Sequence, residues 1–311
     1  MKKQIGFKNT VYFRQAGLLM RILPIIAKEP VFALKGGTAI NFFVRNLPRL
    51  SIDIDLTYLP LDSRNTALSE ITSALRRISS GISKTFPKAK IVEKSIESSK
   101  YISGMVIRTD VTVKIEVNTV IRGSVYKPKV NELVEKAEEY FGLSLSVNTL
   151  SFADLYGGKI CAALDRQHPR DLFDVKLLFE NEGITEETRK AFIVYLISHS
   201  RPIAEVLSPV LHSDLESVFK NEFKDMAEIE VSLDDILNAR DVLVKQIVRI
   251  LNEDERKFLI GFKTGMPEWS LLGLDGIENL PAVQWKMKNL SGMDDGKREK
   301  AGRKLKKVLE V

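Results

Sequence analysis

The hydrophobic pattern of this chain changes its period near residue 150, and this change limits what each half can fold into. Residues 111–118 alternate apolar and polar side chains, and residues 52–59 begin with the same alternation, which predicts half-buried strands. From residue 151 almost to residue 263, apolar positions recur at helical spacing. We therefore predict a mixed α/β domain over residues 1–150 and a helical domain over residues 151–311.

The remaining elements follow from periodicity, capping and turn residues. In the first domain we expect helices over 12–27 (ended or kinked by Pro24), 38–45, 63–83 and near 131–141, and strands over 31–34, 89–94, 104–108 and 145–149. In the second we expect helices over 151–166, 170–180, 185–198 and 233–251. The stretch from about residue 297 to the end carries seven Lys or Arg residues against two Glu, which predicts a basic helix or a frayed tail.

Composition excludes several classes of protein. The single cysteine, Cys161, excludes intramolecular disulfides, and its apolar neighbours predict a buried small hydrophobe. Polar residues interrupt the N-terminal segment where a signal peptide would be apolar, and no apolar run is long enough to span a membrane. We expect a reduced, cytoplasmic protein. The net charge of +6 favours a polyanionic partner without identifying one.

Two acidic side chains, Asp53 and Asp55, share one face of the predicted strand that begins near residue 52. Carboxylates two residues apart on a strand project side by side, and their mutual repulsion is relieved by a divalent cation. Magnesium prefers such oxygen ligands and keeps positions for water and phosphate oxygens, and two carboxylates can bridge two ions. An isolated Asp-x-Asp is more often a solvated strand face, so its surroundings decide the interpretation.

A glycine turn precedes the acidic strand by about 15 residues. Gly36, Gly37 and Thr38 lie where a short apolar run gives way to a helix, and glycines there let the backbone approach a triphosphate at a helix N-terminus. A Gly-Gly pair by itself would indicate only a turn. Together with the two acids, it favours a nucleotide site.

A third carboxylate, Glu116, lies on the polar face of the strand over 111–118. Metal-dependent sites that transfer phosphoryl groups often use a third carboxylate on a neighbouring strand as general base, and Asp is more common than Glu there. Glu116 is the candidate here for a third metal ligand and base, or it pairs with Lys114 on the same face.

Two blocks of the sequence resemble the AbiEii/AbiGii-type nucleotidyltransferase toxins, a group that includes the MenT-like tRNA nucleotidyltransferase toxins. The first block is Lys35-Gly36-Gly37-Thr38-Ala39 followed by Arg49-Leu50-Ser51-Ile52-Asp53-Ile54-Asp55-Leu56, and the second is Lys159 with Pro169-Arg170-Asp171-Leu172-Phe173-Asp174. The resemblance spans roughly residues 20 to 260. It implies a DNA polymerase β-type nucleotidyltransferase fold, with a mixed sheet and flanking helices, followed by a helical domain.

The resemblance also implies roles for individual residues. Asp53 and Asp55 would hold magnesium, the Gly36–Thr38 turn would contact the triphosphate, and Lys159 and Asp174 from the helical domain would complete the catalytic set. The alternatives are a solvated helix position for Lys159 and a pair with Arg170 for Asp174. Arg49 and Ser51 are candidate phosphate contacts, or a surface charge and a turn residue.

The implied activity is that of a toxin in a toxin–antitoxin or phage-defence (abortive infection) system. With NTP as co-substrate and Mg²⁺, it would add a nucleoside monophosphate to the 3′ acceptor end of tRNA, modifying the acceptor stem and blocking translation, and a cognate antitoxin protein would oppose it. The alternatives are transfer to a protein, a phosphotransferase using the same metal site, and a non-catalytic module that binds RNA or a partner.

Two tryptophans and several basic residues are possible RNA contacts. Trp269 and Trp285 can stack on bases, but a Trp in an apolar segment usually belongs to the core. Arg76, Arg77 and the basic C-terminal stretch carry the same two interpretations, phosphate contact or solvated charge.

Overall fold

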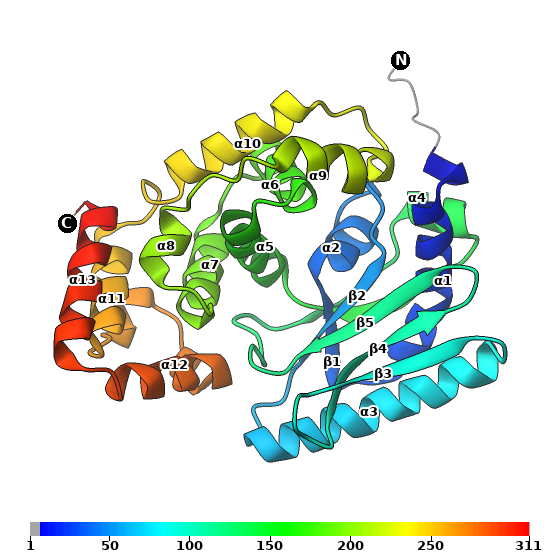
Figure 1. The fold of residues 1–311 in the computed structure, drawn as a ribbon, viewed down its shortest axis with the longest axis horizontal. Coiled ribbons are helices and arrows are strands. Elements are labelled where there is room, and N and C mark those ends of the chain that lie inside the picture. The colour runs from blue at the N-terminus through cyan, green and yellow to red at the C-terminus, as the bar shows by residue number, and fades with distance from the viewer. Residues whose placement is uncertain (1–6, 311) are drawn as a thin grey trace. The chain divides into compact units, whose positions relative to one another are not determined.

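The computed structural model describes residues 7–310, which form two compact units (Figure 1). The first unit contains the described residues up to Ser151 together with Glu222–Val231. The second contains Phe152–Asn221 and the described residues from Ser232 onward. The first unit is a mixed α/β structure and the second is helical, which confirms the predicted fold class.

A seven-stranded mixed sheet forms the centre of the first unit, in the order β3-β4-β5-β2-β1-β7-β6. Its strands are β1 Phe32–Lys35, β2 Asp53–Tyr58, β3 Lys90–Ser95, β4 Ile102–Arg108, β5 Thr112–Asn118, β6 Lys129–Glu132 and β7 Ser146–Thr149. Strand β2 is central, and it pairs parallel with β5 and antiparallel with β1.

The helices of the first unit cover the apolar positions of the sheet. They are the 3₁₀ turn Phe7–Asn9, α1 Val11–Ile26, α2 Gly36–Ala39 with the π-helical turn Ile40–Val44, α3 Arg64–Thr85, α4 Glu135–Phe141 and the 3₁₀ turn Lys224–Met226. Helices α1 and α3 contact each other and the β4–β5 part of the sheet (Figure 1). Helix α1 continues through Pro24, which lies in its last turn, and ends two residues later at Ile26.

The prediction of a helix near 131–141 is wrong for its first four residues. Residues 129–132 form the edge strand β6, antiparallel to β7, and the helix begins only at Glu135. The Asn131 side chain donates a hydrogen bond to Thr149 Oγ1 at 2.7 Å, a contact with a residue distant in sequence. A four-residue strand with a mostly exposed pattern carries no periodic signal, so tertiary pairing decided it.

The second unit consists of helices joined by short connections. They are α5 Phe152–Arg166, α6 Pro169–Asn181, α7 Glu186–Ser198, α8 Ile203–Leu207, α9 Leu215–Glu222, α10 Leu233–Gln246, α11 Glu253–Thr264, the 3₁₀ turns Trp269–Leu272 and Ile277–Asn279, α12 Pro281–Ser291 and α13 Asp295–Leu309. Helices α5 and α7 approach so closely that a Cβ at Gly157 would lie 2.7 Å from the backbone nitrogen of Phe192. Within the described part of the chain, no helix combines the length and hydrophobicity needed to span a membrane.

Several individual expectations have clear outcomes in this unit. The basic C-terminal stretch is the helix α13, which Asp294 caps by accepting a hydrogen bond from the Lys297 amide. Cys161 is buried, as predicted. Trp269 packs against Phe258, with ring centroids 5.7 Å apart, whereas the side chain of Trp285 is exposed.

Candidate functional site

Strand β2 presents Asp53 and Asp55 on one face and buries Ile54 and Leu56 on the other. Both acids are half-buried, and the Asp55 carboxylate has no hydrogen-bond or salt-bridge partner among residues 7–310. This alternation follows from the two-residue period of a strand, which the sequence already contains. The result is a pair of carboxylates on a sheet surface, of which Asp55 is open to a ligand.

The neighbouring strands place two further charged residues beside Asp55. Lys35 at the end of β1 and Glu116 on β5 are both in register with it. Residues in register on adjacent strands point to the same face of a sheet. Lys35, Asp55 and Glu116 therefore form a row across three strands.

Gly36 lies against the Asp55 carboxylate. A Cβ at this position would be 2.7 Å from Asp55 Oδ2, and the backbone has a φ of +70°, which L side chains rarely adopt. Both facts require glycine here. Because glycine has no side chain, the turn that begins α2 leaves space for the Asp55 carboxylate.

Gly37 lies beside the two polar residues that precede β2. A Cβ on Gly37 would be 2.6 Å from Arg49 Nη2 and 3.1 Å from Ser51 Oγ. Arg49 is only 2% exposed, and its Nη1 donates to the Leu50 carbonyl at 2.8 Å. It is not a surface charge, because the guanidinium lies buried against the glycine turn.

Thr38 connects the turn to the acidic strand. Its Oγ1 lies 2.9 Å from Ser51 Oγ and 2.5 Å from the Asp53 carbonyl oxygen, and the side chain is 1% exposed. These hydrogen bonds fix α2 at the start of β2. The structure therefore brings together, in one unit, the glycine turn, Arg49, Ser51 and the two acids.

The Glu116 carboxylate pairs with a lysine of another strand. Its Oε1 lies 2.6 Å from Lys94 Nζ on β3, in an exposed salt bridge that passes over Gly104 of β4. No three His, Cys, Asp or Glu side chains of residues 7–310 are grouped so that they could hold a metal ion. The alternative pair with Lys114 is replaced by a pair with Lys94, which lies two strands away in the sheet.

In the second unit, Lys159 of α5 is buried between two acids of α6. Its Nζ lies 2.7 Å from Asp171 Oδ1 and 3.0 Å from Asp174 Oδ2, and all three side chains are at most 5% exposed. Arg166 adds a second cation, with Nε 2.6 Å from Asp171 Oδ2. Lys159 is therefore not a solvated helix residue. This set is called the buried lysine cluster below.

Asp171 is a member of this cluster that sequence reasoning did not single out. Burial raises the pKa of Asp171, but the charges of Lys159 and Arg166 outweigh burial and hold its pKa well below the usual range. Asp171 and Asp174 are three residues apart and share a helix face. That spacing, with a lysine in the preceding helix, is the signal that would have identified Asp171.

Comparisons with known proteins identify the family and the fold of the chain. The family model of the nucleotidyl transferase AbiEii toxin, type IV toxin–antitoxin system, matches residues 17–289. The nucleotidyltransferase toxin MenT4 from Mycobacterium tuberculosis H37Rv has a similar structure, with a TM-score of 0.55 and 12% sequence identity over 91% of this chain and 95% of that chain. No curated protein matches the sequence.

These findings establish the fold and the family. At 12% identity, the likeness to MenT4 shows a shared fold, a nucleotidyltransferase fold followed by a helical region. The family match covers most of the chain, including both sequence blocks described above. The chain therefore belongs to the AbiEii nucleotidyltransferase toxins of type IV toxin–antitoxin systems.

Proposed function

We propose that this toxin transfers a nucleoside monophosphate from an NTP to the 3′ acceptor end of tRNA in a magnesium-dependent reaction, which blocks translation in the cytoplasm. The observation that carries the proposal is the contact between the glycine turn and the Asp55 carboxylate, where a Cβ at Gly36 would lie 2.7 Å from Oδ2. A backbone turn pressed against a half-exposed acid is suited to a phosphate chain bound through a cation.

The donor set fits a magnesium ion. Asp53 and Asp55 supply carboxylate oxygens on one face of β2, and the missing side chain of Gly36 leaves space beside Asp55. Two protein carboxylates with remaining positions for phosphate oxygens are the usual arrangement for Mg²⁺ bound with a nucleotide. When bound, the ion would neutralise phosphate charge and polarise the α-phosphate.

The protein's own groups would position the nucleotide and the acceptor. The Gly36–Thr38 turn would bind the triphosphate through backbone amides, while Arg49 and Ser51 support that turn from beneath. The 3′ hydroxyl of the acceptor attacks the α-phosphorus, a phosphodiester bond forms, and the bond to the β-phosphate breaks with release of pyrophosphate.

Family resemblance assigns Lys159 and Asp174 to the same reaction. Lys159 would neutralise charge on the phosphates in the transition state, and Asp174, 3.0 Å away, orients its ammonium group. A third-carboxylate role for Glu116 requires its salt bridge to Lys94 to open. We therefore assign metal binding to Asp53 and Asp55, and we expect Glu116 to contribute less to the reaction than either of them.

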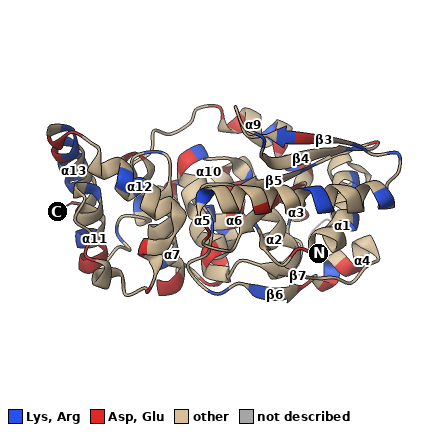
Figure 2. Ribbon diagram, turned by 90° about the horizontal axis from the view of Figure 1, so that it is seen from below, with Lys and Arg blue, Asp and Glu red and all other residues tan. Residues whose placement is uncertain are grey.

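The charge distribution supports an RNA acceptor. The chain has a net charge of +6, and α13 carries seven Lys or Arg residues against Asp295 and Glu299 (Figure 2). Phosphate backbones bind such surfaces with an affinity that falls as salt rises. An antitoxin partner follows from the family.

The test is a transfer assay with purified protein, total tRNA, Mg²⁺ and each α-³²P-labelled NTP in turn. The Asp55→Ala variant is the control, and a parallel set uses γ-labelled NTP. We expect α-label in RNase-sensitive material with the wild type only. The assay identifies the donor nucleotide at the same time.

Each other outcome contradicts a named part of the proposal. Label that resists RNase but not protease means a protein acceptor. Transfer of γ-label means a phosphotransferase. The absence of label with every nucleotide, with growth inhibition unchanged in Asp55→Ala, means a non-catalytic toxin.

A further inference from the structure

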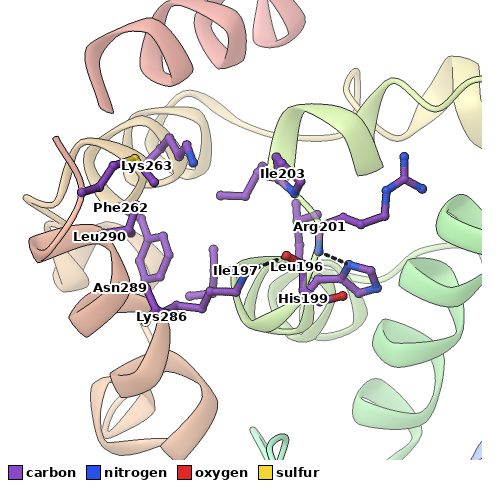
Figure 3. Close-up of a pocket in the computed structure, with 13 residues that line it drawn as sticks. Leu196, Ile197, His199, Arg201, Ile203, Phe262, Lys263, Lys286, Asn289 and Leu290 are labelled. Carbon is purple, nitrogen blue, oxygen red and sulfur yellow. Dashed lines mark hydrogen bonds between the residues drawn. The ribbon is translucent and has the colours of Figure 1, made fainter. Parts of the chain in front are cut away.

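A cavity of about 190 Å³ lies within the second unit, far in sequence from the family motifs (Figure 3). It is formed by the end of α7, the start of α8, the end of α11 and the second half of α12. Its interior is largely apolar, with Leu196, Ile197, Phe262 and Leu290 among the lining residues. No residue that the resemblance identified lines it.

Two lysines enter this cavity from different helices. Lys263 comes from α11 and Lys286 from α12, and both are half-buried. Lys286 Nζ donates a hydrogen bond to the Ser200 carbonyl at 3.2 Å, and Figure 3 shows this bond at the cavity wall. Lys263 has no hydrogen bond or salt bridge to any of residues 7–310. No Asp or Glu of the described chain lines the cavity.

The other two basic side chains of the cavity wall, Arg201 and His199, both face Asp165. Arg201 Nη1 lies 2.8 Å from Asp165 Oδ1, and Figure 3 shows its guanidinium group directed away from Lys263 and Lys286. His199 Nε2 lies 3.5 Å from the other oxygen of Asp165. The uncompensated positive charge of the cavity is therefore that of the two lysines.

This arrangement is unfavourable without an anion. Burial lowers the pKa of Lys263, although the charge of Glu205 opposes the shift, and Glu205 itself pairs with Lys304 at 3.0 Å. Burial also lowers the pKa of Lys286, and the charge of Lys263 lowers it further. Two ammonium groups in a partly desolvated space lose hydration and repel each other. A bound anion offsets both the lost hydration and the repulsion.

We infer that this cavity is a phosphate-binding site, with Lys263 and Lys286 as its cationic ligands and Asn289 as a neutral donor at its edge. A phosphate group carries up to two negative charges near neutral pH and accepts several hydrogen bonds, which matches two ammonium groups. The volume is smaller than that of sites for complete organic ligands, so the site takes a phosphate group and little more. Its source is either free phosphate or the backbone of an RNA.

The test measures protection of individual lysines from acylation. Wild-type protein is treated with a limiting amine-reactive reagent, without and with inorganic phosphate, and modification is quantified at each lysine by peptide mass spectrometry. Lys288, an exposed residue of α12 outside the cavity, is the internal reference. We expect phosphate to protect Lys263 and Lys286 and to leave Lys288 unchanged.

A second measurement compares phosphate affinity by calorimetry in the wild type, the double variant Lys263→Gln/Lys286→Gln and the matched variant Lys288→Gln. We expect the double variant to bind phosphate at least about tenfold more weakly than the wild type, because two charge-assisted contacts are lost. The affinity of Lys288→Gln should equal that of the wild type. Equal protection of all three lysines, or equal affinity in wild type and double variant, would overturn the proposal.

A short single-stranded RNA distinguishes the two sources of the phosphate. If RNA protects Lys263 and Lys286 and competes with inorganic phosphate, the site holds a backbone phosphate. If inorganic phosphate protects them and RNA does not, the ligand is free phosphate. Neither measurement depends on nucleotidyl transfer, so the site and the proposed reaction stand or fall separately.

Discussion

The two acidic clusters of this toxin differ in how their charge is balanced. Asp55 in the first unit lies half-buried on a sheet surface, and no described residue donates a hydrogen bond to its carboxylate. Asp171 in the second unit is 2% exposed and receives Lys159 at 2.7 Å and Arg166 at 2.6 Å. Asp55 therefore has no hydrogen-bond or salt-bridge partner among the described residues, whereas Asp171 has two cationic partners.

This difference predicts which substitutions affect chemistry alone and which also affect folding. Replacing a partly exposed acid with no internal partner removes a ligand-binding group and leaves the fold nearly unchanged. Breaking a buried ion pair leaves an uncompensated charge in a medium of low polarity, and the fold loses stability. The experiments below test this division, beginning with the largest expected effect.

The largest effect is expected for Asp55→Asn on catalysis. The substitution keeps the shape of the side chain and removes its charge, so we expect nucleotidyl transfer to fall about 1000-fold while the free energy of unfolding changes by less than about 0.5 kcal/mol. The measurements are label transfer to RNA and urea denaturation. A variant that unfolds easily would show that Asp55 is a structural residue, and one that retains more than a tenth of the activity would contradict its role as a metal ligand.

The substitution Lys159→Met is expected to lower the free energy of unfolding of the second unit by about 3–5 kcal/mol, because it leaves Asp171 and Asp174 buried with one cation fewer. Lys220→Met is the control, since Lys220 forms an exposed pair with Glu216 on α9 and should cost less than about 0.5 kcal/mol. Thermal and urea denaturation measure both. Equal losses would contradict the comparison.

Acid should weaken the buried lysine cluster in a defined range of pH. The pKa of Asp171 is lower in the folded chain than its ordinary value. Burial raises this pKa, but the charges of the nearby cations lower it by more. Such a carboxyl stabilises the fold at pH values above its unfolded pKa of about 3.9, and this contribution is lost as pH falls below that value. We expect urea denaturation to show stability falling from about pH 5 towards pH 3, with a smaller slope in Asp171→Asn. The same slope in both proteins would contradict the assignment.

The contact between Gly36 and Asp55 can be separated from backbone strain. Gly36 and Gly142 both have positive φ, +70° and +64°, but a Cβ at Gly142 would meet nothing within 4 Å. We expect Gly36→Ala and Gly142→Ala each to cost about 1–2 kcal/mol of stability. Only Gly36→Ala should also reduce transfer, by about 100-fold, because it displaces Asp55. If both variants reduced transfer equally, the close contact between Gly36 and Asp55 would not explain the loss of activity.

The smallest effects are expected at the exposed pair of Glu116 and Lys94. Each of Glu116→Gln and Lys94→Gln should change stability by less than about 1 kcal/mol, because solvent screens the pair. We expect Glu116→Gln to lower transfer by less than about tenfold, well below the loss of a general base. A loss above about 100-fold, with Lys94→Gln unaffected, would restore Glu116 as the third catalytic carboxylate.

The sequence by itself determined the class of the fold and the position of the acidic face. Both follow from periodicity, since alternation puts Asp53 and Asp55 on one side of β2, and helical spacing after residue 151 excludes a second sheet. The Gly36-Gly37-Thr38 turn could also be predicted from the sequence, because the conformational preference of glycine acts locally and does not depend on distant residues.

Only the tertiary structure decided which distant residues meet. It brought Lys94 to Glu116 across Gly104, although Lys114 was the nearer candidate in sequence. It also paired β6 with β7 where a helix had been predicted. Such contacts depend on sheet register and helix packing, which no local pattern contains.

The same reason explains the residues that sequence reasoning missed. Asp171 and the cavity lysines Lys263 and Lys286 carry no motif of their own, and each would be an ordinary solvated charge in an isolated helix. Burial beside another charge gives them their chemistry. Burial is a property of the packed chain, because the free energy of a charge depends on what surrounds it and not on its neighbours in sequence.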